Sequence, residues 1–219
     1  MHAKAFLIVG AGRFGSAVAE TLYRSGHEVV VVDHDESVVQ RVMTSATKAL
    51  VADGTDERAL RDLGASNFDA VVIAIGDHLE ASVLATAAAK DAGARRVVAK
   101  APSALAERIL LRVGADEVVR PERDMGVRLA QHLVTPSLVD AFELGEAYGV
   151  MEVEATAELS GRLAKVRLPN RFGVQVIAIA RSGKLKVSPG ADDEVAPGDR
   201  LVLVGPNEAI ARLRDHLSD

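Results

Sequence analysis

The chain has 219 residues, of which 48% are hydrophobic and 26% are charged, and its formal net charge at pH 7 is −5. This is the composition of a globular protein, and the negative charge together with only 3% aromatic residues argues against nucleic-acid binding. Cysteine is absent, which excludes disulfides and cysteine-ligated metals, and no apolar run is long enough to cross a membrane; we therefore expect a cytoplasmic protein.

Short apolar runs alternate with amphipathic segments through the first two thirds of the chain. The runs are rich in Val, Ile and Ala and nearly continuous, as in strands buried on both faces of a parallel sheet. Six strands are predicted over Ala5–Val9, Glu28–Val32, Lys48–Val51, Ala70–Ala74, Arg96–Ala99 and Glu117–Val119. Helices are predicted over Arg13–Arg24, Glu36–Thr44, Glu57–Leu63, Leu79–Asp91, Ala104–Val113 and Glu122–Leu133. Six such units predict an α/β fold with a Rossmann-like doubly wound parallel sheet.

The pattern changes near Thr135, and a smaller α+β domain is predicted to follow. We interpret Asp140–Glu146 as a linker and expect a helix that Asn207 caps and that ends at Leu217. Strands are predicted over Gly149–Ala155, Gln175–Ala180, Leu185–Val187 and Leu201–Val204. We therefore expect domains at residues 1–134 and 135–219, the second beginning with a linker helix; the helix around 127–138 could belong to either.

A glycine-rich motif, Gly10-Ala11-Gly12-Arg13-Phe14-Gly15, directly follows the first predicted strand and opens the first helix. In such a turn Gly10 permits the tight bend, Gly12 lets the backbone approach a pyrophosphate and Gly15 allows close helix–strand packing. The helix N-terminus presents free N–H groups to the phosphates. The alternative is that these glycines serve packing alone.

The second predicted strand is followed by an acidic residue, Asp33. A carboxylate at this place accepts hydrogen bonds from ribose hydroxyls and repels a 2′-phosphate. His34 adjoins it and is expected near the ribose or the adenine. Strand, glycine turn, helix and acidic residue stand in the expected order, and together they predict an adenine-nucleotide site.

Residues that follow the other strands are expected around the same nucleotide site, because the carboxyl ends of parallel strands share one edge of the sheet. They are Asp53-Gly54, Ile75-Gly76-Asp77, Lys100 and Glu122. Asp53 and Asp77 could instead cap helices. Arg13, at the mouth of the first helix, could either meet a phosphate or be solvated.

The sequence contains no recognisable reaction centre. We find no HExxH, GxSxG, Walker lysine motif or paired-carboxylate arrangement. The C-terminal module offers no evident acid–base pair to act on a bound cofactor. We therefore expect that the protein is not an enzyme, and that it senses a nucleotide rather than consuming it.

The chain resembles the RCK (regulator of K⁺ conductance) regulatory subunits of bacterial potassium transporters, the KtrA/TrkA type. The matching segments are Val9–Gly15, Gly26–Val29, Val32-Asp33, Ala52–Thr55, Val72–Gly76, Val98–Ala101, Gly114–Asp116, Pro121–Gly126, Phe172–Val174, Ser188-Pro189 and Gly198-Asp199. The match covers nearly the whole chain in order, and the run that begins at Pro121 is the most specific part of it.

The resemblance implies a cytoplasmic gating subunit that assembles from dimers into an octameric ring on a membrane-embedded K⁺-translocating subunit of the KtrB/TrkH type. ATP and ADP would compete for the N-terminal RCK domain, and their exchange would change the shape of the ring. The C-terminal RCK domain would serve dimerisation or ligand binding.

Roles for individual residues follow from the same resemblance. It implies that Gly10, Gly12 and Gly15 hold phosphates and that Asp33 binds ribose. The residues implied to line the rest of the pocket are Asp53, Ile75, Gly76, Asp77 and Lys100.

Two charged residues are implied to act between protomers. Arg13 would reach the γ-phosphate of the nucleotide in the adjacent protomer. Glu122 would carry a divalent cation, Mg²⁺ or Ca²⁺, at the dimer interface.

The C-terminal module of this family can bind cyclic di-AMP between two protomers. The resemblance places Leu168, Gln175 and Pro189 in that cleft. The match is poorer here, because Pro169 stands where the family has an arginine and Gln175 where it has an asparagine; Arg167 or Arg171 could substitute. We therefore do not expect tight binding of cyclic di-AMP, and the alternative is a plain dimerisation module.

Two other functions compete with nucleotide-sensing control of K⁺ transport. An NAD(H)-dependent oxidoreductase or NAD(H)-binding redox sensor is the first, because Asp33 suits NAD as well as ATP. Arg13 and Glu122 favour a triphosphate, since neither has an evident role at a nicotinamide. A nucleotide-binding transcription factor is disfavoured by the acidic charge and by the absence of a helix-turn-helix with a basic face.

Overall fold

A computed structural model describes residues 3–76, 78–145 and 147–218, so that Asp77 and Glu146, which the sequence analysis named, lie outside the described residues. The chain divides into two compact units, Met1–Asp124 and Met125–Asp219. The division falls inside helix α6 (Pro121–Val134), whereas the boundary expected from the sequence follows the last residue of that helix.

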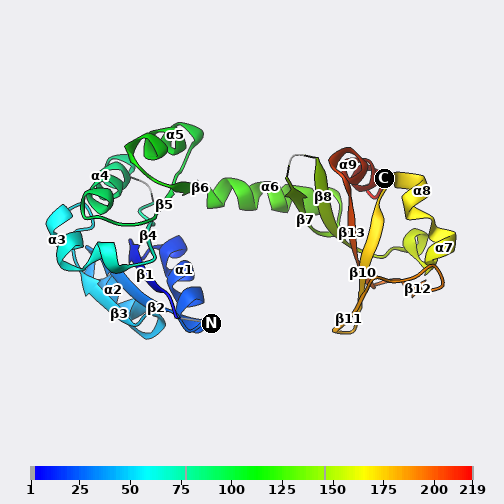
Figure 1. Ribbon diagram of the computed structural model, residues 1–219, viewed down its shortest axis with the longest axis horizontal. Helices are drawn as coiled ribbons and strands as arrows, with labels where there is room; N and C mark the ends of the chain where they lie inside the picture. The colour runs from blue at the N-terminus through cyan, green and yellow to red at the C-terminus, as the bar shows by residue number, and fades with distance from the viewer. Residues whose placement is uncertain (1–2, 77, 146, 219) are drawn as a thin grey trace. The chain divides into compact units, whose positions relative to one another are not determined.

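The first unit contains a six-stranded parallel sheet in the order β3-β2-β1-β4-β5-β6 (Figure 1). Its strands are β1 (Ala5–Val9), β2 (Glu28–Asp33), β3 (Lys48–Val51), β4 (Ala70–Ile73), β5 (Val97–Lys100) and β6 (Glu117–Val119). The order reverses at β1, which lies between β2 and β4, so the chain winds first to one side of β1 and then to the other. This confirms the predicted doubly wound α/β fold.

The central strands are buried on both faces, which explains their nearly continuous apolar sequences. In β1, Leu7 and Val9 belong to one hydrophobic cluster, while Ile8 belongs to another. Helices α1 (Arg13–Arg24) and α2 (Glu36–Val42) supply Ala19 and Val42 to the second cluster, whereas α3 (Glu57–Asp62), α4 (Leu79–Asp91) and α5 (Ala104–Val113) supply residues to the first. The sheet therefore carries helices on both faces, as the sequence predicts.

The helices of this unit begin where the sequence places them, with small shifts at their ends. They are α1 (Arg13–Arg24), α2 (Glu36–Val42), α3 (Glu57–Asp62), α4 (Leu79–Asp91) and α5 (Ala104–Val113). The predicted helix Glu36–Thr44 is too long, because α2 passes into a 3-10 turn over Met43–Ser45 before β3.

The second unit contains a five-stranded antiparallel sheet in the order β11-β10-β13-β8-β7, and a small pair formed by β9 and β12. The strands are β7 (Leu138–Leu144), β8 (Tyr148–Glu154), β9 (Gly161–Arg162), β10 (Gln175–Arg181), β11 (Lys184–Val187), β12 (Glu194–Val195) and β13 (Arg200–Pro206). Helices α7 (Leu163–Val166), α8 (Leu168–Phe172) and α9 (Asn207–His216) complete it (Figure 1). Met151, Leu201, Leu203 and Leu213 are among the fully buried residues of its core.

Two predictions for this unit are wrong. Most of the expected linker 140–146 is strand β7, an edge strand that pairs with β8. Its apolar residues do not alternate cleanly, because Phe142 and Leu144 are exposed while Leu138 is buried. Asn207 does not cap α9; Pro206 holds the cap position and Asn207 is the first helical residue.

In the described part of the chain, no helix is both long and apolar enough to span a bilayer.

Candidate functional site

A cavity of about 350 Å³ opens at the carboxyl edge of the parallel sheet, where the strand order reverses at β1. Backbone that follows β1, β2, β3 and β4 forms its walls. Its lining includes the predicted residues Gly10, Gly12, Asp33, His34, Asp53, Gly54, Ile75 and Gly76. A crevice at this place is where open α/β sheets bind their ligands.

The glycine-rich turn forms one wall of the cavity. At two of its positions, Gly10 and Gly15, a larger residue would collide with neighbouring backbone. Gly10 has φ +95°, and a Cβ there would lie 3.1 Å from the backbone of Ala74 and Ile75. A Cβ on Gly15 would lie 1.9 Å from the carbonyl oxygen of Gly10. Gly15 thus lets α1 pack directly against the turn, as predicted, although it does not itself line the cavity.

Gly12 is different, because a Cβ there would meet no atom within 4 Å. It is the N-cap residue of α1 and makes no side-chain capping bond, and the first turn of the helix carries no acidic residue. The N–H groups of that turn therefore remain available to an anion. The open space at Gly12 is space that a ligand can occupy.

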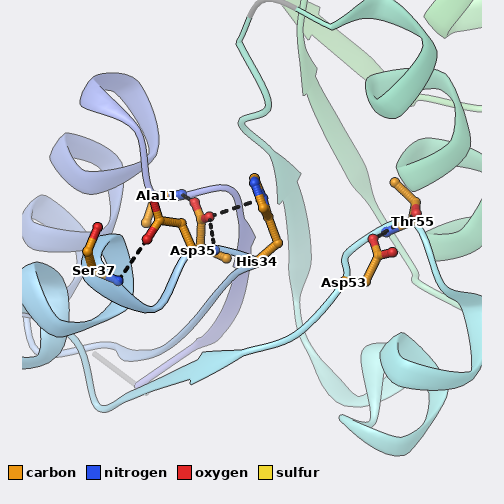
Figure 2. A network of polar contacts seen from close by, with 7 residues as sticks. Ala11, His34, Asp35, Ser37, Asp53 and Thr55 are labelled. Atoms are coloured by element: carbon orange, nitrogen blue, oxygen red, sulfur yellow. Dashed lines mark hydrogen bonds and ion pairs between the residues drawn. The ribbon is translucent and has the colours of Figure 1, made fainter.

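The Asp33 carboxylate binds both the glycine turn and the loop after β2. Its Oδ2 accepts the Ala11 N–H at 2.7 Å, and its Oδ1 accepts the Asp35 N–H at 3.0 Å. The exposed imidazole of His34 lies 3.3 Å from the same carboxylate. Asp35 in turn accepts the Ser37 N–H at 2.8 Å and caps α2, a network that Figure 2 shows. Asp33 is thereby held at the cavity wall.

Asp53 does not cap the following helix, the alternative role that the sequence allows for this residue. Its Oδ1 accepts the Thr55 N–H at 2.9 Å and the Thr55 hydroxyl at 2.7 Å (Figure 2), while Asp56 caps α3. These bonds from Thr55 lower the pKa of Asp53, and hydrogen bonds from Ser37 lower the pKa of Asp35. Both carboxylates are therefore anionic at neutral pH.

The remaining predicted residues lie outside the lining of this cavity. Phe14 packs against the core on the α1 side of the sheet. Lys100 is 8% exposed, and its Nζ lies 2.6 Å from Oε1 of Glu122 in the first turn of α6. The hydrogen bond from Lys100 lowers the pKa of Glu122, and the positive charge of Arg13 adds to the effect. Arg13, Lys100 and Glu122 thus form a charged group beside the cavity.

The residues of one chain do not fit a cation site at Glu122. Among the described residues, no three His, Asp or Glu side chains are placed to hold a metal ion. Glu122 itself is paired with Lys100. A cation at Glu122 would therefore need further ligands from a bound nucleotide or a second copy of the chain.

Sequence reasoning missed some residues of the cavity. They include Asp35, Val38, Thr55 and His78. Asp35 carries the only clear signal among them, since an Asp directly before a helix predicts a cap and hence a fixed position at the cavity rim. Val38 lies in α2, whereas Thr55 and His78 lie shortly before α3 and α4, and nothing in their residue types marks them as cavity residues.

A second cavity, of about 260 Å³, lies in the second unit. Leu168, Gln175 and Pro189, the three residues expected in a cyclic di-AMP cleft, all line it. Arg167 lines it too, with a left-handed backbone at φ +53°. Arg171 is instead paired with Glu158. Of the two arginines considered as substitutes, Arg167 is the one at the cavity.

Comparison with known proteins finds two matching domain families and several relatives of nearly the same length. The TrkA-N domain matches residues 6–121 and the TrkA-C domain matches residues 151–218. The chain is 36% identical to Ktr system potassium uptake protein C of Bacillus subtilis (strain 168), over 95% of each chain. It is 33% identical to Ktr system potassium uptake protein A of the same organism, over 97% of this chain and 96% of the relative.

Solved structures support the fold. The crystal structure of the GsuK RCK domain aligns with all of this chain and 48% of its own, at a TM-score of 0.69 and 16% identity. The chain thus spans about half the length of that protein. The Kef CTD of Shewanella denitrificans in AMP-bound form aligns with 60% of this chain and 80% of its own, at a TM-score of 0.52 and 25% identity.

Proposed function

The chain belongs to the TrkA/Ktr family of potassium uptake proteins, and from that premise we propose that it is a regulatory subunit that gates K⁺ transport in response to a bound adenine nucleotide. The main support for the proposal is the cavity beside β1, where the strand order reverses. The glycine turn, the N-terminus of α1 and Asp33 meet there. Two relatives that match nearly the full length of this chain are potassium uptake proteins.

The cavity suits an adenosine phosphate. The ribose hydroxyls would donate hydrogen bonds to Asp33, and the phosphates would lie at the N-terminus of α1 beside Gly12. Asp35 and Asp53 add negative charge at the ribose side of the cavity, which disfavours a 2′-phosphate. AMP in the Kef CTD supports the nucleotide class. We propose ATP and ADP as the ligands.

The ligand is proposed to act as a signal and not as a reagent. The pKa values of Asp35 and Asp53 are both lowered by hydrogen bonds. Carboxylates of this kind make weak proton acceptors and donors at neutral pH, because a general acid or base works best with a pKa near the working pH. They are better suited to holding a ligand than to transforming it.

Self-association is the second part of the proposal. Helix α6 has no buried residue among those described, yet Met125, Leu129 and Leu133 recur every four residues along it and are more than half exposed. Phe142 and Leu144 of β7 are also exposed. Apolar surface of this extent marks a protein contact. We propose that copies of the chain associate through it, up to an octameric ring.

The ring would act from the cytoplasmic face of the membrane on a K⁺-translocating partner. A bound nucleotide would favour whichever shape of the ring binds it more tightly, which is how its exchange would control K⁺ flux. In this assembly Arg13 would contact the γ-phosphate of a nucleotide in the neighbouring copy, and Glu122 would supply one carboxylate to a divalent cation.

Calorimetry with ATP, ADP, NAD⁺ and NADH, with and without Mg²⁺ or Ca²⁺, tests the proposal. Asp33→Ala should weaken ATP and ADP alike, by about tenfold, because both carry the ribose. Arg13→Ala should weaken ATP more than ADP, because only ATP has a γ-phosphate. Cyclic di-AMP belongs in the same series, since the residues expected for its cleft line the second cavity.

Several results would contradict the proposal. A protein that binds none of the adenine nucleotides, or that exchanges hydride between NADH and a metabolite, does not fit a nucleotide-sensing regulator. Preference for NADH over ATP would favour an NAD(H)-binding redox sensor. Equal losses of ATP and ADP affinity in Arg13→Ala would remove the arginine from the γ-phosphate.

A further inference from the structure

Lys100 carries a buried positive charge. It ends β5, and its side chain is 10% exposed. A buried ammonium group is strongly destabilising unless an anion pairs with it. The Nζ atom lies 2.6 Å from Oε1 of Glu122, and this carboxylate is the anion that the ammonium requires.

The ammonium group also lies directly behind one wall of the nucleotide cavity. Gly76 lines that cavity, and a Cβ built on Gly76 would lie 3.8 Å from the Lys100 Nζ. Gly76 has no side chain to fill the space between its own backbone and the ammonium group. The long flexible stem of lysine allows the charged group to shift by the short distance required.

Separation of the ion pair costs Glu122 less electrostatic stabilisation than it costs Lys100. The side chain of Glu122 is 66% exposed, so water can solvate the carboxylate. The positive charge of Arg13, which acts on the same carboxylate, provides a second source of stabilisation. The two partners are therefore unequal: Lys100 needs an anion at all times, whereas Glu122 tolerates release.

We propose that Lys100 exchanges partners when a nucleotide binds, leaving Glu122 for a phosphate that reaches past Gly76. The inference rests on the proposed function, since it requires a phosphate in the cavity. Glu122 lies in the first turn of α6, the helix in which the chain passes from the first unit to the second. Release of Glu122 thus connects occupancy of the cavity to the start of that helix.

The exchange makes Glu122 a competitor of the ligand, which gives an unusual prediction. Glu122→Gln should bind ADP about fivefold more tightly, because Lys100 no longer has to leave an anionic partner. Lys100→Met should bind ADP about tenfold more weakly. The double variant should match Lys100→Met alone, because Glu122 acts on the ligand only through Lys100.

Calorimetry with ADP in the presence of EDTA measures these affinities while a cation at Glu122 is excluded. Lys90→Met is the matched control, because Lys90 pairs with Asp116 in the same unit away from the cavity lining, and it should leave ADP affinity unchanged. Circular dichroism establishes that each variant is folded. If Lys100→Met does not fold, the gain in Glu122→Gln still decides the question.

The results separate the exchange from the function on which it rests. A wild-type chain that binds ADP, with unchanged or weaker binding in Glu122→Gln, overturns the exchange and leaves the nucleotide site intact. Additive effects in the double variant overturn it too. A wild-type chain that binds no adenine nucleotide overturns both.

Discussion

The two units of the chain build their cavities in different ways. In the first unit the cavity lies where β1, β2, β3 and β4 end, so each strand delivers residues to one edge of a parallel sheet. In the second unit the cavity is formed by the short helices α7 and α8, the first residues of β10 and the loop after β11. A regular sheet edge is visible in a sequence, whereas a wall made of short turns is not.

The chemistry of the two cavities differs as well. Asp33, Asp35 and Asp53 line the first, all held by hydrogen bonds from their surroundings. The second contains Arg167 among mainly apolar residues. A ligand with donor hydroxyls suits the first cavity, and a ligand with an anionic group suits the second. The units can therefore be perturbed separately, and the following predictions use this separation.

The largest effect is expected from Gly15→Ala, which places a Cβ 1.9 Å from the Gly10 carbonyl oxygen. The turn and α1 cannot both keep their positions, so the first unit should lose about 3 kcal/mol or more of stability. Hydrogen exchange followed by mass spectrometry should show faster exchange throughout β1 and α1. The second unit should keep its protection.

Gly12→Ala is the matched control, since a Cβ there meets no atom within 4 Å. It should change stability by less than about 0.5 kcal/mol, while ADP binds about tenfold more weakly because the methyl group takes space beside the phosphates. A stable, nucleotide-binding Gly15→Ala would contradict the close packing of the turn. Unchanged ADP affinity in Gly12→Ala would place the phosphates elsewhere.

Much of the first unit could be predicted because its elements follow simple rules. Six elements have the bounds that the sequence predicts: strands β1, β3 and β6 and helices α1, α4 and α5. Residues such as Gly10 and Asp33 reach the cavity because a strand end leads them there. Lys100 and Glu122 meet each other instead of lining the cavity, which depends on the side-chain path of Lys100 and leaves no trace in the sequence.

The second unit shows where sequence reasoning reaches its limit. Most of the predicted linker 140–146 is strand β7, whose pairing with β8 shifts register between Leu138 and Asp140, so that no regular alternation runs through the whole strand. Helices α7 and α8 span four and five residues, too few for a helical period to show. Leu168, Gln175 and Pro189 came from the family resemblance, and only the folded chain brings them around one cavity.

An intermediate effect, confined to the second unit, is expected from Asp199→Ala. The Asp199 side chain is 3% exposed and accepts hydrogen bonds from Arg181 Nε at 2.7 Å and from the Ala196 N–H at 2.7 Å. Its loss should lower the free energy of unfolding of this unit by about 2 kcal/mol. Urea unfolding measures that change, and calorimetry should find ADP affinity within twofold of wild type.

Asp215→Ala is the control for this prediction, because its exposed carboxylate pairs only with the neighbouring Arg214 among the described ion pairs. It should leave the unfolding midpoint unchanged. If Asp199→Ala altered ADP binding as strongly as stability, the two units would not be separable in the way described.

The smallest effect is expected in the acid range, at Glu158. Hydrogen bonds from His216 and Arg171 lower the pKa of this carboxyl in the folded chain. A group whose pKa is lowered on folding contributes stability above its ordinary value of about 4.3 and loses that contribution as the pH falls through the lower, folded pKa. Glu158→Gln should therefore lower Tm by about 2 °C at pH 7.

Thermal unfolding of both proteins from pH 7 to pH 3 measures this effect. The difference in Tm should shrink as the pH falls below about 5, because protonation removes the same charge from wild-type Glu158. A difference that persisted unchanged at pH 3 would show that the carboxylate's charge is not the cause.

The bonds that Asp33 makes to Ala11 and Asp35 bear on how this protein could be redesigned. Cofactor preference in such sheets is commonly altered by replacing the acidic residue after the second strand with a smaller or basic one. Here that replacement would also release the backbone of the glycine turn. Selectivity and loop architecture share a single side chain, so an engineered change in one must supply a new anchor for the other.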